Sequence, residues 1–131
     1  MEEIIMNKIV TDKAPQAIGP YSQGMTFGNM VFTSGQIPVD PATGAVGGET
    51  IEVQAEQSCK NVGEVLKAGG SCFENVIKTT CFLADMADFP AFNKIYEKFF
   101  ISCPARSCVA VKDLPKGVLC EIEAIGFVKE N

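Results

Sequence analysis

The sequence predicts one α+β domain over residues 1–131, in which two helices cover one face of a mixed β-sheet. Three observations lead to this fold class. The first and last thirds of the chain alternate apolar and polar residues as strands do, the middle holds two segments of helical periodicity, and a further strand lies between them. Two helices on one face of a sheet is an economical packing for this order of elements. It leaves the other sheet face uncovered, which in a small domain usually indicates self-association.

The first third of the chain predicts short strands joined by loops. Residues 6–10 form the first strand candidate, and a loop over residues 11–24 follows. The segment MTFGNMVFTSGQI then predicts a hairpin that turns at Gly28 and Asn29. The next segment, PVDPATGAVGGET, is rich in turn residues and predicts a surface loop.

Helical periodicity appears first over residues 51–68, where Thr50 is the expected N-cap and Gly69 and Gly70 supply the stop. Residues 75–83 alternate as a strand would, and a second helix is expected to begin near Asp88, since Pro90 is tolerated in a first turn. This helix carries an aromatic stripe, which is far more typical of a core than of a ligand pocket. The stripe consists of Phe89, Phe92, Tyr96 and either Phe99 or Phe100.

The last third predicts two strands, RSCVAV and VLCEIEAIGFV, joined by KDLPKG. A period of two places Arg106 and Cys108 on one face of their strand, and Glu121 and Glu123 on one face of theirs. Arginine is costly to bury unpaired, so Arg106 either points to solvent or faces a cleft that needs a fixed positive charge. In a hairpin a carboxylate could approach Arg106 directly or across a subunit boundary. The alternative is a surface ion pair that carries no function.

Composition and charge argue against several classes of function. The net charge of −5 and the pI near 4.7 argue against a nucleic-acid partner, because a phosphate-binding surface needs clustered Lys and Arg, and the eleven here are scattered. No segment reaches the roughly 20 apolar residues of a membrane-spanning helix. The N-terminus MEEIIMNKIV is acidic and lacks a signal-peptide core, so we expect a cytoplasmic protein without a membrane partner.

The cysteine and histidine counts narrow the chemistry further. The six cysteines show no CxxC spacing and the chain has no histidine, so no zinc site is expected. Reduced thiols that pack as small apolar groups are the simplest interpretation in a cytosolic chain. Without histidine, Ser-His and Cys-His nucleophile systems are excluded. Acid–base chemistry would have to use carboxylates, Tyr, Lys, Cys or water.

Five motifs in order along nearly the whole chain resemble the RidA/YjgF family of 2-imino acid deaminases. They are GPYSQ at residues 19–23, FTSGQIPVDPATG at 32–44, KTTCFLADMADFPAFNKIYEKFF at 78–100, PARSC at 104–108, and LPKG with EIEAIG between 114 and 126. The resemblance implies a chorismate-mutase-like (YjgF-like) fold and a homotrimer whose sheets line a central barrel, with clefts between adjacent subunits. It also implies hydrolysis of 2-iminobutanoate and 2-iminopropanoate to 2-oxo acids and ammonia, without a metal or organic cofactor.

The resemblance also implies roles for individual residues. Arg106 would bind the substrate carboxylate, which its planar fork can grip through two parallel hydrogen bonds. Glu121 would position the attacking water and accept its proton. The same pocket would be lined by Tyr21, Ser34, Gly35, Asn93 and Cys108. Each of these residues has a purely structural alternative, and by spacing alone Glu123 competes with Glu121.

Other functions remain open at this point. The cleft could bind or sense 2-oxo acids without turnover. The ribonuclease activity attached to some relatives fits the acidic balance and the absence of histidine least well, and a holdase role is a further alternative. The connection ISC before PARSC is shorter than in many relatives, so we expect it to affect which side chains the pocket accepts.

Overall fold

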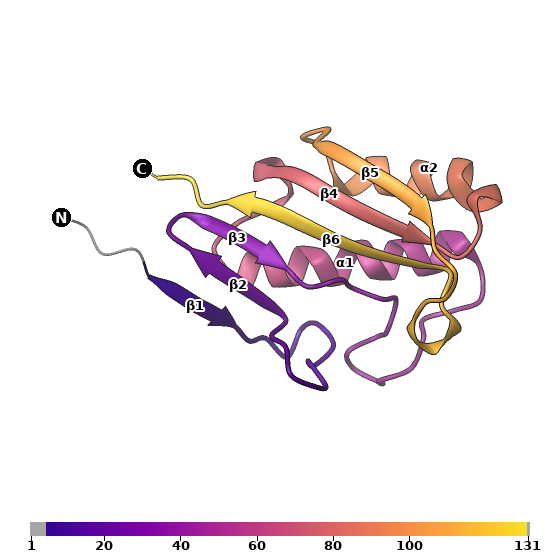
Figure 1. Ribbon diagram of the computed structural model, residues 1–131, viewed down its shortest axis with the longest axis horizontal. Helices are drawn as coiled ribbons and strands as arrows, with labels where there is room; N and C mark the ends of the chain where they lie inside the picture. The colour runs from indigo at the N-terminus through magenta and orange to yellow at the C-terminus, as the bar shows by residue number, and fades with distance from the viewer. Residues whose placement is uncertain (1–4, 131) are drawn as a thin grey trace.

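The computed structural model describes residues 5–130, so the first four residues of the acidic N-terminal segment and Asn131 lie outside the described residues. Six strands form one mixed sheet in the order β1-β2-β3-β6-β4-β5. Both helices lie on the same side of this sheet (Figure 1). The expected fold class, a mixed sheet with two helices on one face, is therefore confirmed.

The elements follow the expected order and bounds closely. The strands are β1 (Met6–Ile9), β2 (Gly24–Phe27), β3 (Met30–Thr33), β4 (Val76–Leu83), β5 (Ala105–Ala110) and β6 (Cys120–Phe127). The helices are α1 (Ile51–Ala68) and α2 (Phe89–Phe99), and short 3-10 turns span Phe73–Asn75, Met86–Asp88 and Pro115–Gly117.

The local signals explain where these elements begin and end. The hydroxyl of Thr50 accepts a hydrogen bond from the backbone N–H of Val53 at 3.3 Å and caps α1. Pro90 lies in the first turn of α2, where its missing N–H costs nothing. Gly28, with φ of 60°, makes the turn between β2 and β3.

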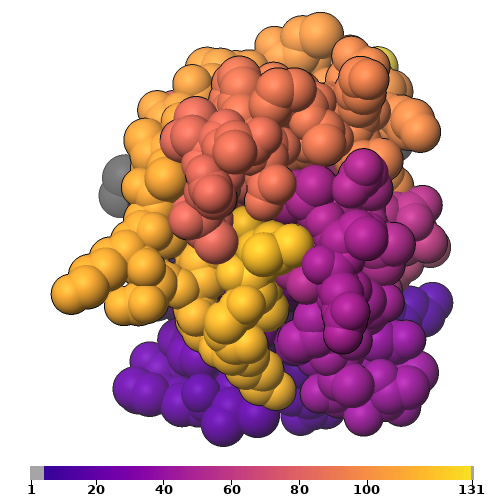
Figure 2. All heavy atoms as spheres, turned by 90° about the vertical axis from the view of Figure 1, so that its right-hand side faces the viewer, coloured from indigo at the N-terminus to yellow at the C-terminus, as the bar shows by residue number. Residues whose placement is uncertain are grey.

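The last two strands do not form the hairpin that would bring Arg106 and a carboxylate together directly. β4 lies between β5 and β6, pairing parallel with β5 and antiparallel with β6. The physical reason is the connection through α2, since a strand–helix–strand crossover returns the chain parallel to its starting strand. The loop that carries Pro115–Gly117 therefore spans the end of β4 to reach β6. Figure 2 looks at this end of the molecule, where the orange loop stands out from the surface.

The core lies between the helices and the covered face of the sheet. It is built mainly from α1 and from alternate residues of β4 and β6, with Phe92 and Phe100 from the α2 region. Alternate residues are fully or nearly fully buried along β6 and, beyond a register irregularity between Val76 and Lys78, along β4, as period two requires when one face is covered. None of the helices between residues 5 and 130 is both long and apolar enough to cross a bilayer.

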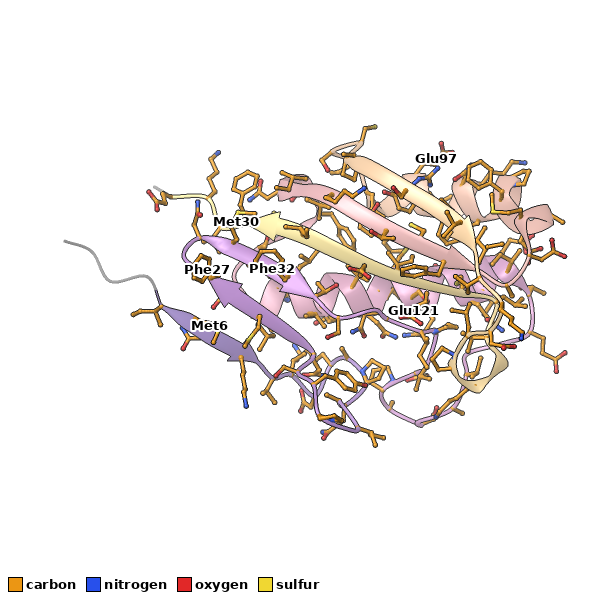
Figure 3. The ribbon with its side chains drawn as sticks, viewed as in Figure 1. Met6, Phe27, Met30, Phe32, Glu97 and Glu121 are labelled. Atoms are coloured by element: carbon orange, nitrogen blue, oxygen red, sulfur yellow. The ribbon has the colours of Figure 1, made fainter. Side chains whose placement is uncertain are left out.

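The opposite face of the sheet, which we call the open face, carries an apolar band. Strand register places Met6 beside Phe27, Phe27 beside Met30, and Met30 beside Phe127. Met6 is 64%, Phe27 51% and Phe32 37% exposed. These side chains come from β1, β2 and β3 (Figure 3). A band of this kind is typical of an interaction surface.

Candidate active site

Arg106 lies on β5 and points to the helix-covered side of the sheet. It pairs in register with Thr79 of β4, which is fully buried under the helices, and paired neighbours point to the same side. Its Nη1 donates a hydrogen bond to Oδ1 of Asn93 on α2 at 2.8 Å. Among residues 5–130 its guanidinium makes no other hydrogen bond and no ion pair. The guanidinium therefore keeps donors for a ligand.

Aromatic rings of α2 support the Arg106 guanidinium. Its central carbon lies 4.7 Å from the centre of the Tyr96 ring and 5.4 Å from that of Phe89. The hollow beside the guanidinium has a volume of about 420 Å³, and Glu97 and Cys103 line it with Asn93. Within residues 5–130, Arg106 is thus neither a free surface cation nor half of an ion pair.

Cys108 follows two residues after Arg106 on β5 and points to the same side. It lies in register with Cys81 of β4. Burial raises the pKa of the Cys108 thiol, and the nearby Arg106 only partly offsets this. Burial also raises the pKa of Cys81 to about 12. Both thiols therefore stay protonated at neutral pH, which suits a wall or a weak hydrogen-bond donor better than a nucleophile.

Glu121 lies on β6 and points to the open face of the sheet. It pairs with Phe82 of β4, three residues beyond Thr79, and an odd spacing along a strand reverses the side. Burial, with a smaller contribution from Glu123, raises the pKa of the Glu121 carboxyl. A raised pKa brings a carboxylate closer to the range in which it can exchange protons at neutral pH.

Gly35 leaves the space that the Glu121 carboxylate occupies. A Cβ atom added at Gly35 would collide with the Glu121 side chain, Oε2 in particular. The neighbouring residue Gln36 exchanges two backbone hydrogen bonds with Ile122, at 2.8 and 3.1 Å, which fix this segment against β6. Glycine is required here for close approach, not for an unusual backbone conformation.

Tyr21 and Ser34 lie near the Gly35 segment. The Ser34 hydroxyl donates to the backbone carbonyl of Ser22 at 2.5 Å, and the Ser34 N–H donates to that of Gln23 at 2.8 Å. Tyr21 is 54% exposed and lines two hollows. One hollow, of about 560 Å³, includes Ser34, and the other, of about 480 Å³, includes Gly35.

The structure thus separates the expected site residues into two groups. Asn93, Arg106 and Cys108 form the helix-side group, and Tyr21, Ser34, Gly35 and Glu121 form the open-face group. Figure 3 labels Glu97, which lines the Arg106 hollow, and Glu121, which belongs to the other group. The expectation that Glu121 or Glu123 could approach Arg106 directly within one chain is wrong, because the two strands point these side chains to opposite faces.

Sequence reasoning did not assign Tyr96, Phe89 or Thr79 to the site. The aromatic stripe on α2 indicated a core, and Tyr96 is indeed 8% exposed and packs against Phe100 with ring centres 4.4 Å apart. The sequence did point to Asn93, which lies between Phe89 and Tyr96 along the same helix. Among the described residues, no three His, Cys, Asp or Glu side chains are arranged to hold a metal ion.

The chain resembles known proteins over almost its whole length. The model of the endoribonuclease L-PSP family matches residues 11–128. A 2-iminobutanoate/2-iminopropanoate deaminase of Salmonella typhimurium is 53% identical over 121 residues, covering 89% of this chain and 94% of that protein. A Lactococcus lactis protein named as a candidate regulator, AldR, is 52% identical and covers 95% of this chain and 99% of its own.

Solved structures show the same fold. The YjgF gene product of E. coli superposes with a TM-score of 0.89 at 47% identity, covering 94% of this chain and 99% of that one. The structure of E. coli TdcF with bound serine gives a TM-score of 0.89 at 46% identity, with the same coverage of 94% and 99%. The YjgF-like fold expected from the motifs is therefore confirmed.

Proposed function

The chain belongs to the endoribonuclease L-PSP family, also called RidA/YjgF, and from this premise we infer that it is a 2-iminobutanoate/2-iminopropanoate deaminase. The reaction adds water to the C=N bond of a 2-imino acid and releases a 2-oxo acid and ammonia. The observation that carries the proposal is the state of Arg106, a half-buried guanidinium with one internal hydrogen bond and donors left for a carboxylate. The chain's similarity to named deaminases at about half identity supports it.

The proposed active site is formed between two subunits. Arg106 and Glu121 point to opposite faces of their own sheet, so a substrate that touches both must lie between two copies of the chain. The exposed apolar band on the open face supports such an assembly, because its burial would stabilise contact between copies. We take the assembly to be a homotrimer with the open faces turned inward, as the family resemblance implies.

Arg106 would bind the carboxylate that every 2-imino acid carries next to its reactive carbon. The guanidinium can donate two parallel hydrogen bonds to the two carboxylate oxygens. Each charge-assisted bond contributes about 1.5–3 kcal/mol. Because one end of the guanidinium is already held by Asn93, the substrate would be oriented as well as bound.

Glu121 of the neighbouring subunit would hold the attacking water. Its carboxylate would accept a proton as the water oxygen bonds to the imine carbon, and would return a proton to the nitrogen as ammonia leaves. The pKa of Glu121, raised by burial and by Glu123, suits this exchange. Tyr21, Ser34, Gly35 and Cys108 would form the walls of the cleft.

The proposal is tested by supplying the imine directly. A threonine dehydratase generates 2-iminobutanoate from threonine, and the formation of 2-oxobutanoate is followed with and without the protein. We expect the wild-type protein to accelerate the final hydrolysis and Arg106→Ala to give the uncatalysed rate. Equal rates with and without the wild-type protein would contradict the proposal.

A second candidate is a binding module that senses small carboxylates without turnover. The relative named as a candidate regulator and the TdcF structure with bound serine favour considering it. Glu121→Gln distinguishes the two functions. An enzyme should lose hydrolysis and still bind 2-oxobutanoate, whereas a pure binder has no catalysed rate to lose.

A further inference from the structure

We propose that Tyr96 and Thr79 are positioning residues for Arg106, with the Tyr96 ring as the surface that carries the guanidinium and the Thr79 hydroxyl as the group that orients this ring. The inference rests on the proposed function of Arg106 as the carboxylate-binding residue. It adds to that function the internal structure that holds the guanidinium ready before substrate arrives.

The Arg106 guanidinium lies against the ring of Tyr96. The central guanidinium carbon lies 4.7 Å from the centre of the Tyr96 ring, closer than the 5.4 Å to Phe89, and both are within the range of a cation–π interaction. Tyr96 itself stacks on Phe100 at 4.4 Å with ring planes 22° apart. The guanidinium therefore rests on a ring that is itself fixed in the core.

The hydroxyl of the same Tyr96 side chain is paired with the Thr79 hydroxyl. The Tyr96 and Thr79 hydroxyl oxygens are 2.6 Å apart, and Thr79 is fully buried. Thr79 also lies directly beside Arg106, as its register partner on the neighbouring strand. One residue of β4 thus fixes the ring and flanks the backbone of the arginine that the ring supports. Burial raises the pKa of Tyr96 to about 12, so the hydroxyl stays protonated and the ring neutral at working pH.

This arrangement would fix the Arg106 guanidinium before a carboxylate ligand binds. An arginine side chain loses considerable rotamer freedom when it is fixed, and this cost weakens binding if it is incurred only when the ligand arrives. Here the ring restrains the plane of the guanidinium while Asn93 holds Nη1. The remaining donors then face a carboxylate in one orientation. Lysine could not copy this, since its ammonium has no plane to stack.

The test measures 2-oxobutanoate binding by calorimetry in the full-length protein. Tyr96→Leu removes the ring, and a cation–π contact of this size predicts a Kd raised about tenfold. Tyr96→Phe keeps the ring and loses the hydroxyl, so a smaller increase is expected, and Thr79→Val should match it. Thr79→Ser keeps the hydroxyl, so its Kd should stay close to the wild-type value. The matched control is Phe99→Leu, which removes a ring of the same helix that contacts Phe73, and its Kd should stay at the wild-type value.

Chemical rescue separates positioning from a loss of stability. In Arg106→Ala, millimolar methylguanidinium should restore part of the hydrolysis by occupying the surface of the Tyr96 ring. The same addition should fail in Arg106→Ala combined with Tyr96→Leu. Equal rescue in both, or a Tyr96→Leu protein that binds 2-oxobutanoate as tightly as wild type, would overturn the inference. A wild-type protein that neither binds 2-oxobutanoate nor hydrolyses the imine would overturn the proposed function first, and the inference with it.

Discussion

The two groups of site residues differ in how complete they are within one chain. On the helix side, Arg106 has a hydrogen-bond partner, two supporting rings and a buried hydroxyl pair behind one of them. On the open face, Glu121 has the space left by Gly35 and a like-charged neighbour in Glu123, and the same face carries the exposed apolar band. The helix-side group is built by folding alone.

The difference indicates that folding of one chain forms the helix-side group, whereas the open-face group would be completed by assembly with another chain. The part that we propose binds the substrate carboxylate is held by contacts within one chain, whereas the part that we propose handles water and protons lies on the face that another subunit would cover. Exclusion of water raises the pKa of a carboxyl group, and a subunit interface over Glu121 would exclude water from it.

The largest effect should come from replacing the guanidinium while keeping its charge. For Arg106→Lys we expect kcat/KM to fall at least about 100-fold, because lysine can neither stack on Tyr96 nor donate two parallel hydrogen bonds. Single-turnover kinetics with the dehydratase-generated imine would measure this. A Lys variant with near wild-type activity would mean that a positive charge alone suffices, and that neither stacking on Tyr96 nor two parallel hydrogen bonds are needed.

The next effect concerns assembly through the open face. Phe27→Glu places a charge in the middle of the apolar band, so we expect a smaller species by analytical ultracentrifugation and hydrolysis reduced to background. The control is Val53→Glu, which is a similarly exposed apolar position on α1. If Phe27→Glu stays associated and active, the open face is not the interface.

A more local change sharpens the account of the open-face group. Gly35→Ala should displace the Glu121 carboxylate, because the added methyl group would overlap with it. We expect kcat to fall about 10- to 100-fold, with 2-oxobutanoate binding close to wild type, since Arg106 is untouched. Calorimetry and steady-state rates on the same sample would separate the two. Loss of binding with unchanged kcat would reverse the roles of the two groups.

The smallest effect is a shift in the pH profile. Because Glu123 raises the pKa of Glu121, Glu123→Gln should lower that pKa and move the acid limb of kcat/KM to lower pH. The direction follows from the need for an ionised Glu121 to accept a proton from water. An acid limb that stays in place would show that another group sets it.

The order and bounds of the elements could be predicted because their signals are local. The Thr50 cap, the turn at Gly28 and the alternation in β4 and β6 each act within a few residues. The pairing of strands could not be predicted in the same way. Whether β5 pairs with β4 or β6 depends on the path of the chain through α2, and this determined which face Arg106 and Glu121 occupy.

The site was predictable in its parts more than in its arrangement. The motifs pointed to Arg106, Asn93 and Glu121, and the structure places the first two in contact. The proposed role of Tyr96 could not be predicted, because an aromatic residue at helical spacing belongs to the core in most proteins, and here the same ring packs in the core and lies against the Arg106 guanidinium. Only the distance to Arg106 distinguishes the two.

The measurement that tests the shared site most directly is complementation between two inactive variants. Arg106→Ala and Glu121→Gln are unfolded together, mixed in equal amounts and refolded, so that their subunits assemble at random. If each site takes its arginine from one subunit and its glutamate from the next, about one quarter of the sites will be intact and about one quarter of wild-type activity will return. Activity that stays at background in mixed assemblies, confirmed as mixed by mass spectrometry, would contradict the account.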